Sequence, residues 1–182
     1  GLPFYVMPFI EGESLRARLQ RGPLSLSAML SVLEPLCAAL HARGHVVLPG
    51  LVNTHHHLNQ TLTRALPAGQ DAGLFDWLTA HYPAWTRIDA EASRTSTLVG
   101  LAELLLSGCT TVFDHTYLYQ NGNSVDVQVE AARDIGVRFH ASRGSMSVGR
   151  SKGGLPPDEA VEDEAFILED SERVIGRFHD PR

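Results

Sequence analysis

Apolar and polar positions in the first part of this chain recur mainly with helical spacing, and apart from one short run near the start, the runs typical of strands come after residue 44. Over residues 25–43 apolar side chains fall on one face at helical spacing, which predicts an amphipathic helix that ends at Gly44. A short apolar strand at 4–7 and a brief helix at 15–20 are expected before it. The pattern therefore predicts a mainly helical segment over residues 1–44.

From residue 45 onward the pattern predicts strands that alternate with helices. Apolar and β-branched runs predict strands at 45–54, 110–113 and 137–141. Helical spacing predicts helices in the stretches between and after them, at about 74–80, 90–107, 125–135 and 161–175. This order favours an α/β fold with parallel strands joined by helical crossovers. About three βα units cannot close an eight-stranded barrel, so the alternatives are a small open sheet or a partial barrel.

The composition excludes several classes of protein. Fifteen basic against 21 acidic residues give a net charge of −6, and no basic run is present, which excludes a nucleic-acid binder that neutralises phosphates. No apolar run approaches the roughly 20 residues that cross a bilayer, and no signal peptide is recognisable. The two cysteines, Cys37 and Cys109, do not form a C-x-x-C pair, which favours a reducing compartment. We therefore expect a cytoplasmic protein without membrane partners.

Three consecutive histidines follow the first strand of the predicted α/β region. Because side chains alternate along a strand, we expect His55 and His57 to point together and His56 to point away. Neutral imidazoles are ligands that Zn²⁺ accepts, and sites in parallel α/β folds lie at the carboxyl ends of strands. A solvated loop is the alternative, but the preceding strand and its Pro-Gly entry favour a metal site at His55 and His57.

The sequence around these histidines resembles a known family. Residues 49–67, PGLVNTHHHLNQTLTRALP, are similar to strand 1 and its loop in the amidohydrolase superfamily, in the branch of cytosine deaminases and chlorohydrolases. The similarity continues through LFDWL, LAELLLSGCTTV and GVRFHASRGSMS, which begin at 74, 101 and 136. Within that branch the chain most resembles 8-oxoguanine deaminase-like and hydroxytriazine-processing aminohydrolases. The resemblance implies that residues 45–182 form the N-terminal part of a (β/α)8 TIM-like barrel.

The resemblance also implies an activity and a set of site residues. It implies a metal-dependent hydrolase that deaminates a small purine- or triazine-like heterocycle, with zinc as the expected metal. His55 and His57 become metal ligands, because they match the H-x-H motif of strand 1. Gln60, Trp77 and Arg143 match positions that line the substrate pocket, and plain core packing is the alternative for Trp77.

The remaining metal ligands and proton carriers of that family come from later strands, which have no counterpart in this sequence. Asp114 and His115, at the end of the second predicted strand, are weak candidates for a catalytic role, and polar side chains at a strand edge are the alternative. His140, in the middle of a predicted strand, is expected either to be packed or to support a metal ligand without binding the metal, and His179 is expected to be solvated. We therefore expect these 182 residues to be inactive alone. The alternative function is a non-catalytic α/β fragment that binds metal weakly.

The first 44 residues resemble another class of protein. Residues 2–19, LPFYVMPFIEGESLRARL, and the helix ending in HARG at 41–44 are similar to parts of a bacterial serine/threonine protein kinase. The Gly-rich loop, the H-R-D motif and the D-F-G motif are missing, so kinase activity is excluded. We therefore predict a kinase-like fragment at 1–44 joined to an amidohydrolase part at 45–182. We also expect self-association through the exposed edges of the incomplete barrel.

Overall fold

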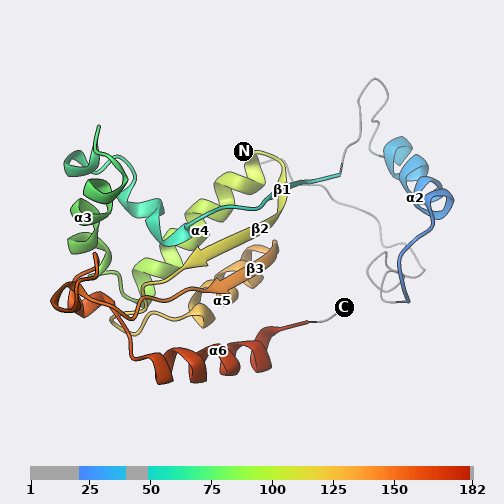
Figure 1. The fold of residues 1–182 in the computed structure, drawn as a ribbon. Helices are drawn as coiled ribbons and strands as arrows, with labels where there is room; N and C mark the ends of the chain where they lie inside the picture. Colours follow the sequence, from blue (N-terminus) through green and yellow to red (C-terminus); the bar gives the residue numbers. More distant parts are fainter. Residues whose placement is uncertain (1–20, 40–48, 181–182) are drawn as a thin grey trace. The chain divides into compact units, whose positions relative to one another are not determined.

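The computed structural model describes residues 21–39 and 49–180, which belong to two compact units (Figure 1). The described part of the first unit holds α2 (Leu26–Ala39), where the sequence predicts a helix. Ser25 precedes this helix, and its hydroxyl accepts a hydrogen bond from the backbone N–H of Ala28 at 3.2 Å, as an N-cap residue does. The strand expected at 4–7, the helix expected at 15–20 and the expected helix end at Gly44 lie outside the described residues.

The second unit is built on a three-stranded parallel sheet. Its strands are β1 (Leu51–Asn53), β2 (Cys109–Thr116) and β3 (Arg138–Arg143), and they lie side by side in that order. Both pairings are parallel, with Asn53 opposite Val112 and Phe139 also opposite Val112. The parallel α/β arrangement expected from the sequence is therefore present.

Two helices form the crossovers of this sheet. They are α4 (Ala90–Leu106) and α5 (Val125–Ile135), which pack against each other and against the same face of the sheet (Figure 1). Asp89 caps α4 by accepting a hydrogen bond from the N–H of Ala92 at 2.8 Å. Gly136 ends α5 with φ at 81°, a left-handed conformation that glycine adopts without strain. These are local signals that the sequence displays.

The connections of the second unit contain shorter elements. Between β1 and α4 lie η1 (Leu58–Thr63), η2 (Pro67–Gly69) and α3 (Leu74–Trp85). After β3 come η3 (Arg150–Lys152), η4 (Asp158–Ala160) and the last helix, α6 (Glu164–Phe178). No helix in the described ranges is both long enough and apolar enough to span a membrane.

Two apolar clusters form the core of this unit. One joins η1, α4, β2 and α5 through Leu58, Leu101, Cys109, Val112 and Ala132. The other packs α3 against the loops that follow β2 and β3, through Tyr82, Trp85, Ile88, Leu118 and Ala160. Both clusters lie next to the connection between β1 and α4, which they hold against the sheet.

Burial differs from the sequence expectations in three elements. The apolar run at 45–54 is typical of a buried strand, but β1 is shorter than predicted, lies at the edge of the sheet, and has Leu51 and Val52 that are 59% and 61% exposed. On α4 the predicted apolar face is only partly confirmed: Leu101 is fully buried, but the other buried residues are Ser93, Ser96, Thr97 and Gly100 rather than leucines. On α6 the helical spacing of Ala165, Leu168 and Ile175 predicts an apolar face, but these side chains are exposed, and the buried residue of this helix is Val174, which the pattern does not predict.

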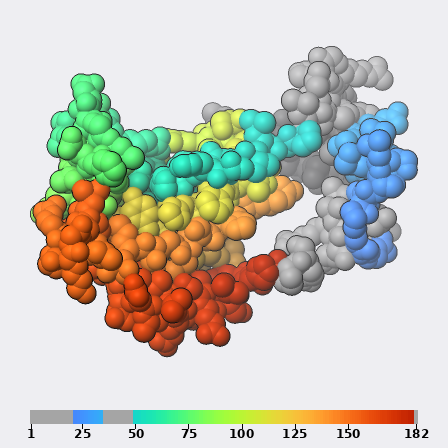
Figure 2. Space-filling view, viewed as in Figure 1, coloured from blue at the N-terminus to red at the C-terminus, as the bar shows by residue number. Residues whose placement is uncertain are grey.

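We expect the chain to self-associate. The edge strand β1 carries exposed apolar side chains, visible as part of the cyan surface in Figure 2, and the free edge of β3 lines a groove of about 590 Å³ beside α6. Unpaired strand edges of this kind promote association between chains. Sedimentation velocity should show mass increasing with protein concentration, and Val52→Lys should shift the distribution toward monomer. A wild-type chain that stays monomeric at every concentration would contradict this prediction.

Candidate functional site

A buried carboxylate holds the segment after β1 against the end of β2. Asp114 is only 1% exposed. Its Oδ1 accepts a hydrogen bond from the backbone N–H of Leu58 at 2.6 Å, and its Oδ2 accepts from Thr116 at 3.0 Å and from Gln128 at 2.8 Å. Burial raises the pKa of Asp114, and these donors act against that rise. Asp114 therefore ties η1, β2 and α5 together.

The chain just before η1 carries the histidines, and two of their rings lie together. The ring centroids of His55 and His57 are 5.1 Å apart, with the planes at 86°. The Nδ1 atom of His57 lies 2.6 Å from the carbonyl oxygen of His115. Because a carbonyl oxygen can only accept, Nδ1 must carry a proton, so in the neutral form of the ring the lone pair is on Nε2 of His57. That is the neutral tautomer in which an imidazole binds a metal.

The middle histidine turns the other way. His56 is half-buried beside Gly100 of α4, and its Nδ1 has no hydrogen-bond partner among the described residues. Burial lowers the pKa of His56, although nearby Asp114 opposes the effect. The backbone carbonyl of His56 accepts a hydrogen bond from the N–H of His115 at 2.9 Å, which continues the contact between the two strands. The predicted separation of His56 from its neighbours is therefore present.

Two side chains from the end of β2 border the pair. The ring centroid of His115 lies 5.5 Å from that of His57, and the ring of Tyr117 lies 6.1 Å from His57 and 5.6 Å from His115. Burial, and secondly the neighbouring His57, lowers the pKa of His115. Burial raises the pKa of Tyr117 to about 12, against the effect of a hydrogen bond with Gln60. Sequence reasoning missed Tyr117, although its position two residues after His115 predicts the same face.

The donors present fit a metal such as zinc in kind but not in number. His55 and His57 offer imidazole nitrogens, which Zn²⁺ binds well. Within residues 21–39 and 49–180, however, no three or more His, Cys, Asp or Glu side chains are grouped so that they could hold a metal ion. Asp114 does not extend the set, because its carboxylate is buried and hydrogen-bonded on both oxygens.

The predicted pocket residues Gln60 and Trp77 have different surroundings. Gln60 lies close to the pair, since its backbone N–H donates to the carbonyl of His57 at 2.9 Å and its side chain bonds to Tyr117. Trp77 instead packs within α3, with ring centroids 4.3 Å from His81 and 5.2 Å from Trp85. The structure thus supports core packing, the alternative considered for Trp77.

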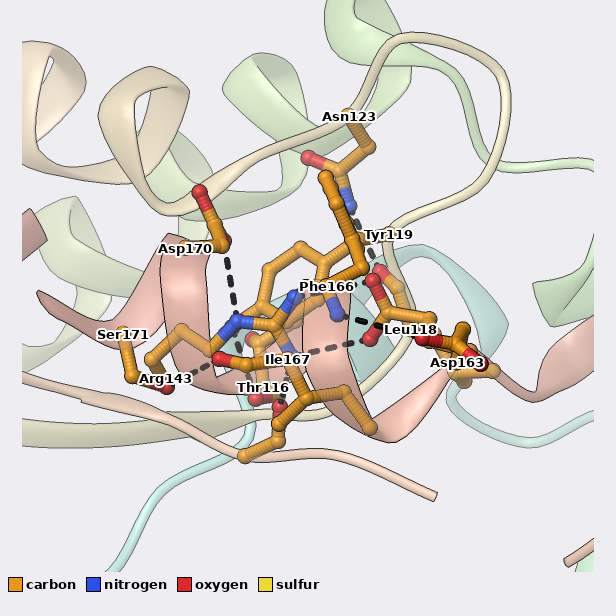
Figure 3. A network of polar contacts seen from close by, with 12 residues as sticks. Thr116, Leu118, Tyr119, Asn123, Arg143, Asp163, Phe166, Ile167, Asp170 and Ser171 are labelled. Carbon is orange, nitrogen blue, oxygen red and sulfur yellow. Dashed lines mark hydrogen bonds and ion pairs between the residues drawn. The ribbon is translucent and has the colours of Figure 1, made fainter. Parts of the chain in front are cut away.

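The third predicted pocket residue, Arg143, is the centre of a buried ion-pair network (Figure 3). Its side chain is 4% exposed and donates to both carboxylate oxygens of Glu162 at 2.8 Å and to Asp170 at 2.9 Å. Its guanidinium carbon also lies 4.7 Å from the ring centroid of Tyr119. The expected contact between Arg143 and a substrate is not supported, because these partners already occupy the guanidinium.

The two other histidines considered from the sequence lie apart from the pair. His140 is exposed, and its ring contacts Phe113 at 5.3 Å between centroids. The expectation that His140 is packed is therefore wrong, because it lies on the sheet face opposite to the one that α4 and α5 cover. His179 is exposed, as expected.

The parallel sheet and the histidines at the carboxyl end of β1 are features of α/β hydrolytic enzymes that hold a metal. Comparison with known proteins makes the assignment specific. The profile of the amidohydrolase family matches residues 46–179, so the chain belongs to the amidohydrolase family. This confirms the family resemblance of the sequence.

Relatives of known activity and structure cover the same region. The chain is 50% identical over 148 residues to 8-oxoguanine deaminase of Pseudomonas aeruginosa. The matched region covers 80% of this chain and 33% of that protein. It is 42% identical over 149 residues to hydroxydechloroatrazine ethylaminohydrolase of a Pseudomonas species, and this match covers 79% of this chain and 31% of that protein. The crystal structure of atrazine chlorohydrolase from Arthrobacter aurescens, complexed with zinc, matches with a TM-score of 0.65 and 32% identity. The match covers 74% of this chain and 32% of that chain.

The chain therefore spans about a third of the length of the relatives it matches. The structural likeness confirms the fold class as an α/β part of a (β/α)8 barrel.

We expect Arg143→Met to destabilise the second unit strongly. The change leaves the carboxylates of Glu162 and Asp170 without their main buried partner, and breaking a buried pair in this way costs about 3 kcal/mol or more. Arg173→Met is the matched control, because that arginine is 42% exposed and surface pairs contribute about 1 kcal/mol or less. Urea unfolding measures both free energies, and equal losses would contradict the assignment of Arg143 as a structural centre.

Proposed function

We propose that this chain supplies two metal ligands, His55 and His57, to an enzyme that hydrolytically deaminates a small heterocycle. The observation that carries the proposal is the hydrogen bond from Nδ1 of His57 to the carbonyl of His115, which leaves Nε2 free as a ligand. The packing of the two imidazoles at the carboxyl end of β1 supports it, because sites in parallel α/β folds lie there.

Zinc is the metal we propose for this site. The family generally uses a divalent metal, and one structural relative was crystallised with zinc. When bound, the metal would supply Lewis acidity for hydrolysis of a C–N bond. The residues of this chain have separate tasks. His55 and His57 hold the metal, while Gln60 and Tyr117 border the space beside it.

The substrate class we propose is a purine- or triazine-like ring. The support is the identity to an 8-oxoguanine deaminase and to an aminohydrolase of hydroxydechloroatrazine, whose names describe hydrolysis of amino groups on such rings. The neutral phenol of Tyr117 suits a flat heterocycle, because it offers both an aromatic face and a hydrogen-bonding group.

Zinc binding tests the proposed ligands directly. We expect weak binding to the wild-type chain, because two imidazoles form an incomplete ligand set, and loss of this binding in the double variant His55→Ala, His57→Ala. The matched control is His140→Ala, His179→Ala, which removes two exposed histidines away from the pair and should bind like wild type. Isothermal titration at neutral pH measures the three affinities. Equal binding by all three proteins would contradict the proposed site.

Ammonia release tests the proposed reaction. We expect none from the chain alone at saturating zinc, because no third metal ligand lies beside the pair within the described residues. We expect deamination of 8-oxoguanine by a chimera in which residues 50–180 replace the matching part of the Pseudomonas aeruginosa deaminase. The same chimera carrying His55→Ala and His57→Ala should lose activity. A folded, zinc-loaded chimera without activity would favour the alternative, a non-catalytic fragment that binds metal weakly.

A cytoplasmic location and self-association stay predictions at this stage. The first follows from the sequence, in which neither cysteine lies in a C-x-x-C pair, and the second from the free edges of β1 and β3 among the described strands.

A further inference from the structure

The residue that follows β3 approaches the end of β2 closely. Gly144 donates its backbone N–H to the carbonyl of Thr116 at 2.8 Å, and its own carbonyl accepts a hydrogen bond from Arg143 at 2.9 Å. Its φ is not in the left-handed region, so the backbone conformation itself does not require glycine. The requirement comes from space, because a Cβ atom here would lie 2.5 Å from Nε2 of His115 and 2.7 Å from the carbonyl oxygen of Thr116.

The absence of a side chain at Gly144 gives the His115 ring its position. The ring lies against the glycine backbone, and its other neighbours are the rings of His57, at 5.5 Å, and Tyr117, at 5.6 Å. Gly144 cannot move away easily, because hydrogen bonds hold both its N–H and its carbonyl. The imidazole of His115 is therefore placed between a fixed backbone and the ring of His57.

We propose that His115, supported by Gly144, is a positioning residue that orients the imidazole of His57. The inference rests on the proposed function, in which Nε2 of His57 is a metal ligand. The backbone carbonyl of His115 fixes one side of the His57 ring by accepting from Nδ1, and the side chain of His115 restricts rotation of the same ring. One residue thus sets both the tautomer and the direction of the ligand.

The side chain of His115 has no described hydrogen bond of its own to the pair, so its effect is steric. A ring held on one side only by a single hydrogen bond can rotate about its Cβ–Cγ bond and lose its alignment toward the metal. Substitutions of residues that orient metal ligands typically weaken metal affinity about 10- to 100-fold. We expect the lower end of this range, because the backbone carbonyl of residue 115 remains in every variant.

His115→Ala tests the positioning role, and His140→Ala is its matched control. Both histidines lie on β2 or β3 and contact one or more rings, but His140 contacts Phe113 rather than the pair. In the metal-free chain, we expect His115→Ala to shift and broaden the imidazole NMR signals of His57, and His140→Ala to leave them unchanged. We expect zinc affinity to fall about tenfold in His115→Ala, with a melting temperature close to that of wild type.

Gly144→Ala approaches the same contact from the other side. Its methyl group should push the His115 ring toward His57 and change the same NMR signals, while Gly176→Ala, which meets no atom within 4 Å, serves as control. If Gly144→Ala does not fold, the metal-free NMR comparison of His115→Ala with wild type still tests the positioning role. Unchanged His57 signals in folded His115→Ala would overturn the inference, even where zinc binds. Wild-type zinc binding that does not depend on His55 and His57 would instead refute the proposed function, and the metal-free NMR comparison would still test His115.

Discussion

The buried carboxylate of Asp114 is the interaction on which the arrangement of the second unit depends. It accepts hydrogen bonds from the start of η1, from its own strand and from α5, so three elements far apart in sequence meet at one group. A carboxyl group at 1% exposure is costly unless its oxygens are hydrogen-bonded, which makes the three donors obligatory partners. Because Leu58 directly follows His57, fixing Leu58 also fixes where the histidines leave β1.

The position of the histidine pair then follows from β2. His115 is adjacent to Asp114, and its backbone bonds both to the carbonyl of His56 and to Nδ1 of His57. The end of β2 therefore continues the contact with the chain of β1 beyond the last paired residue of that strand. Two adjacent residues, Asp114 and His115, therefore hold both the backbone of η1 and the ring of His57 in place.

Much of this could be predicted from sequence, and the limits have physical causes. Helix ends, the parallel order and the common direction of His55 and His57 follow from local signals such as Asp89, Gly136 and strand alternation. The roles of Asp114 and Arg143 could not be predicted, because they depend on partners 14 to 56 residues away. The buried face of α4 was predicted only in part, because Leu101 is buried as expected, whereas small polar residues fill the close contact with η1.

Because side chains alternate between the two faces of a strand, the buried hydrogen-bonded groups and the residues of the proposed metal site lie on opposite faces at the carboxyl end of the sheet. Asp114 and Thr116 point toward the helices, and Thr116 lies opposite Arg143, so Asp114 and Arg143 share the covered face. His115 lies opposite Ser142, on the other face, with the ring of Tyr117 beside it. Buried charges need fixed partners, whereas a metal ligand needs an open lone pair, and strand alternation provides both environments one residue apart. The same alternation explains why the neighbouring residues Asp114 and His115 cannot exchange roles, since each is oriented toward a different face.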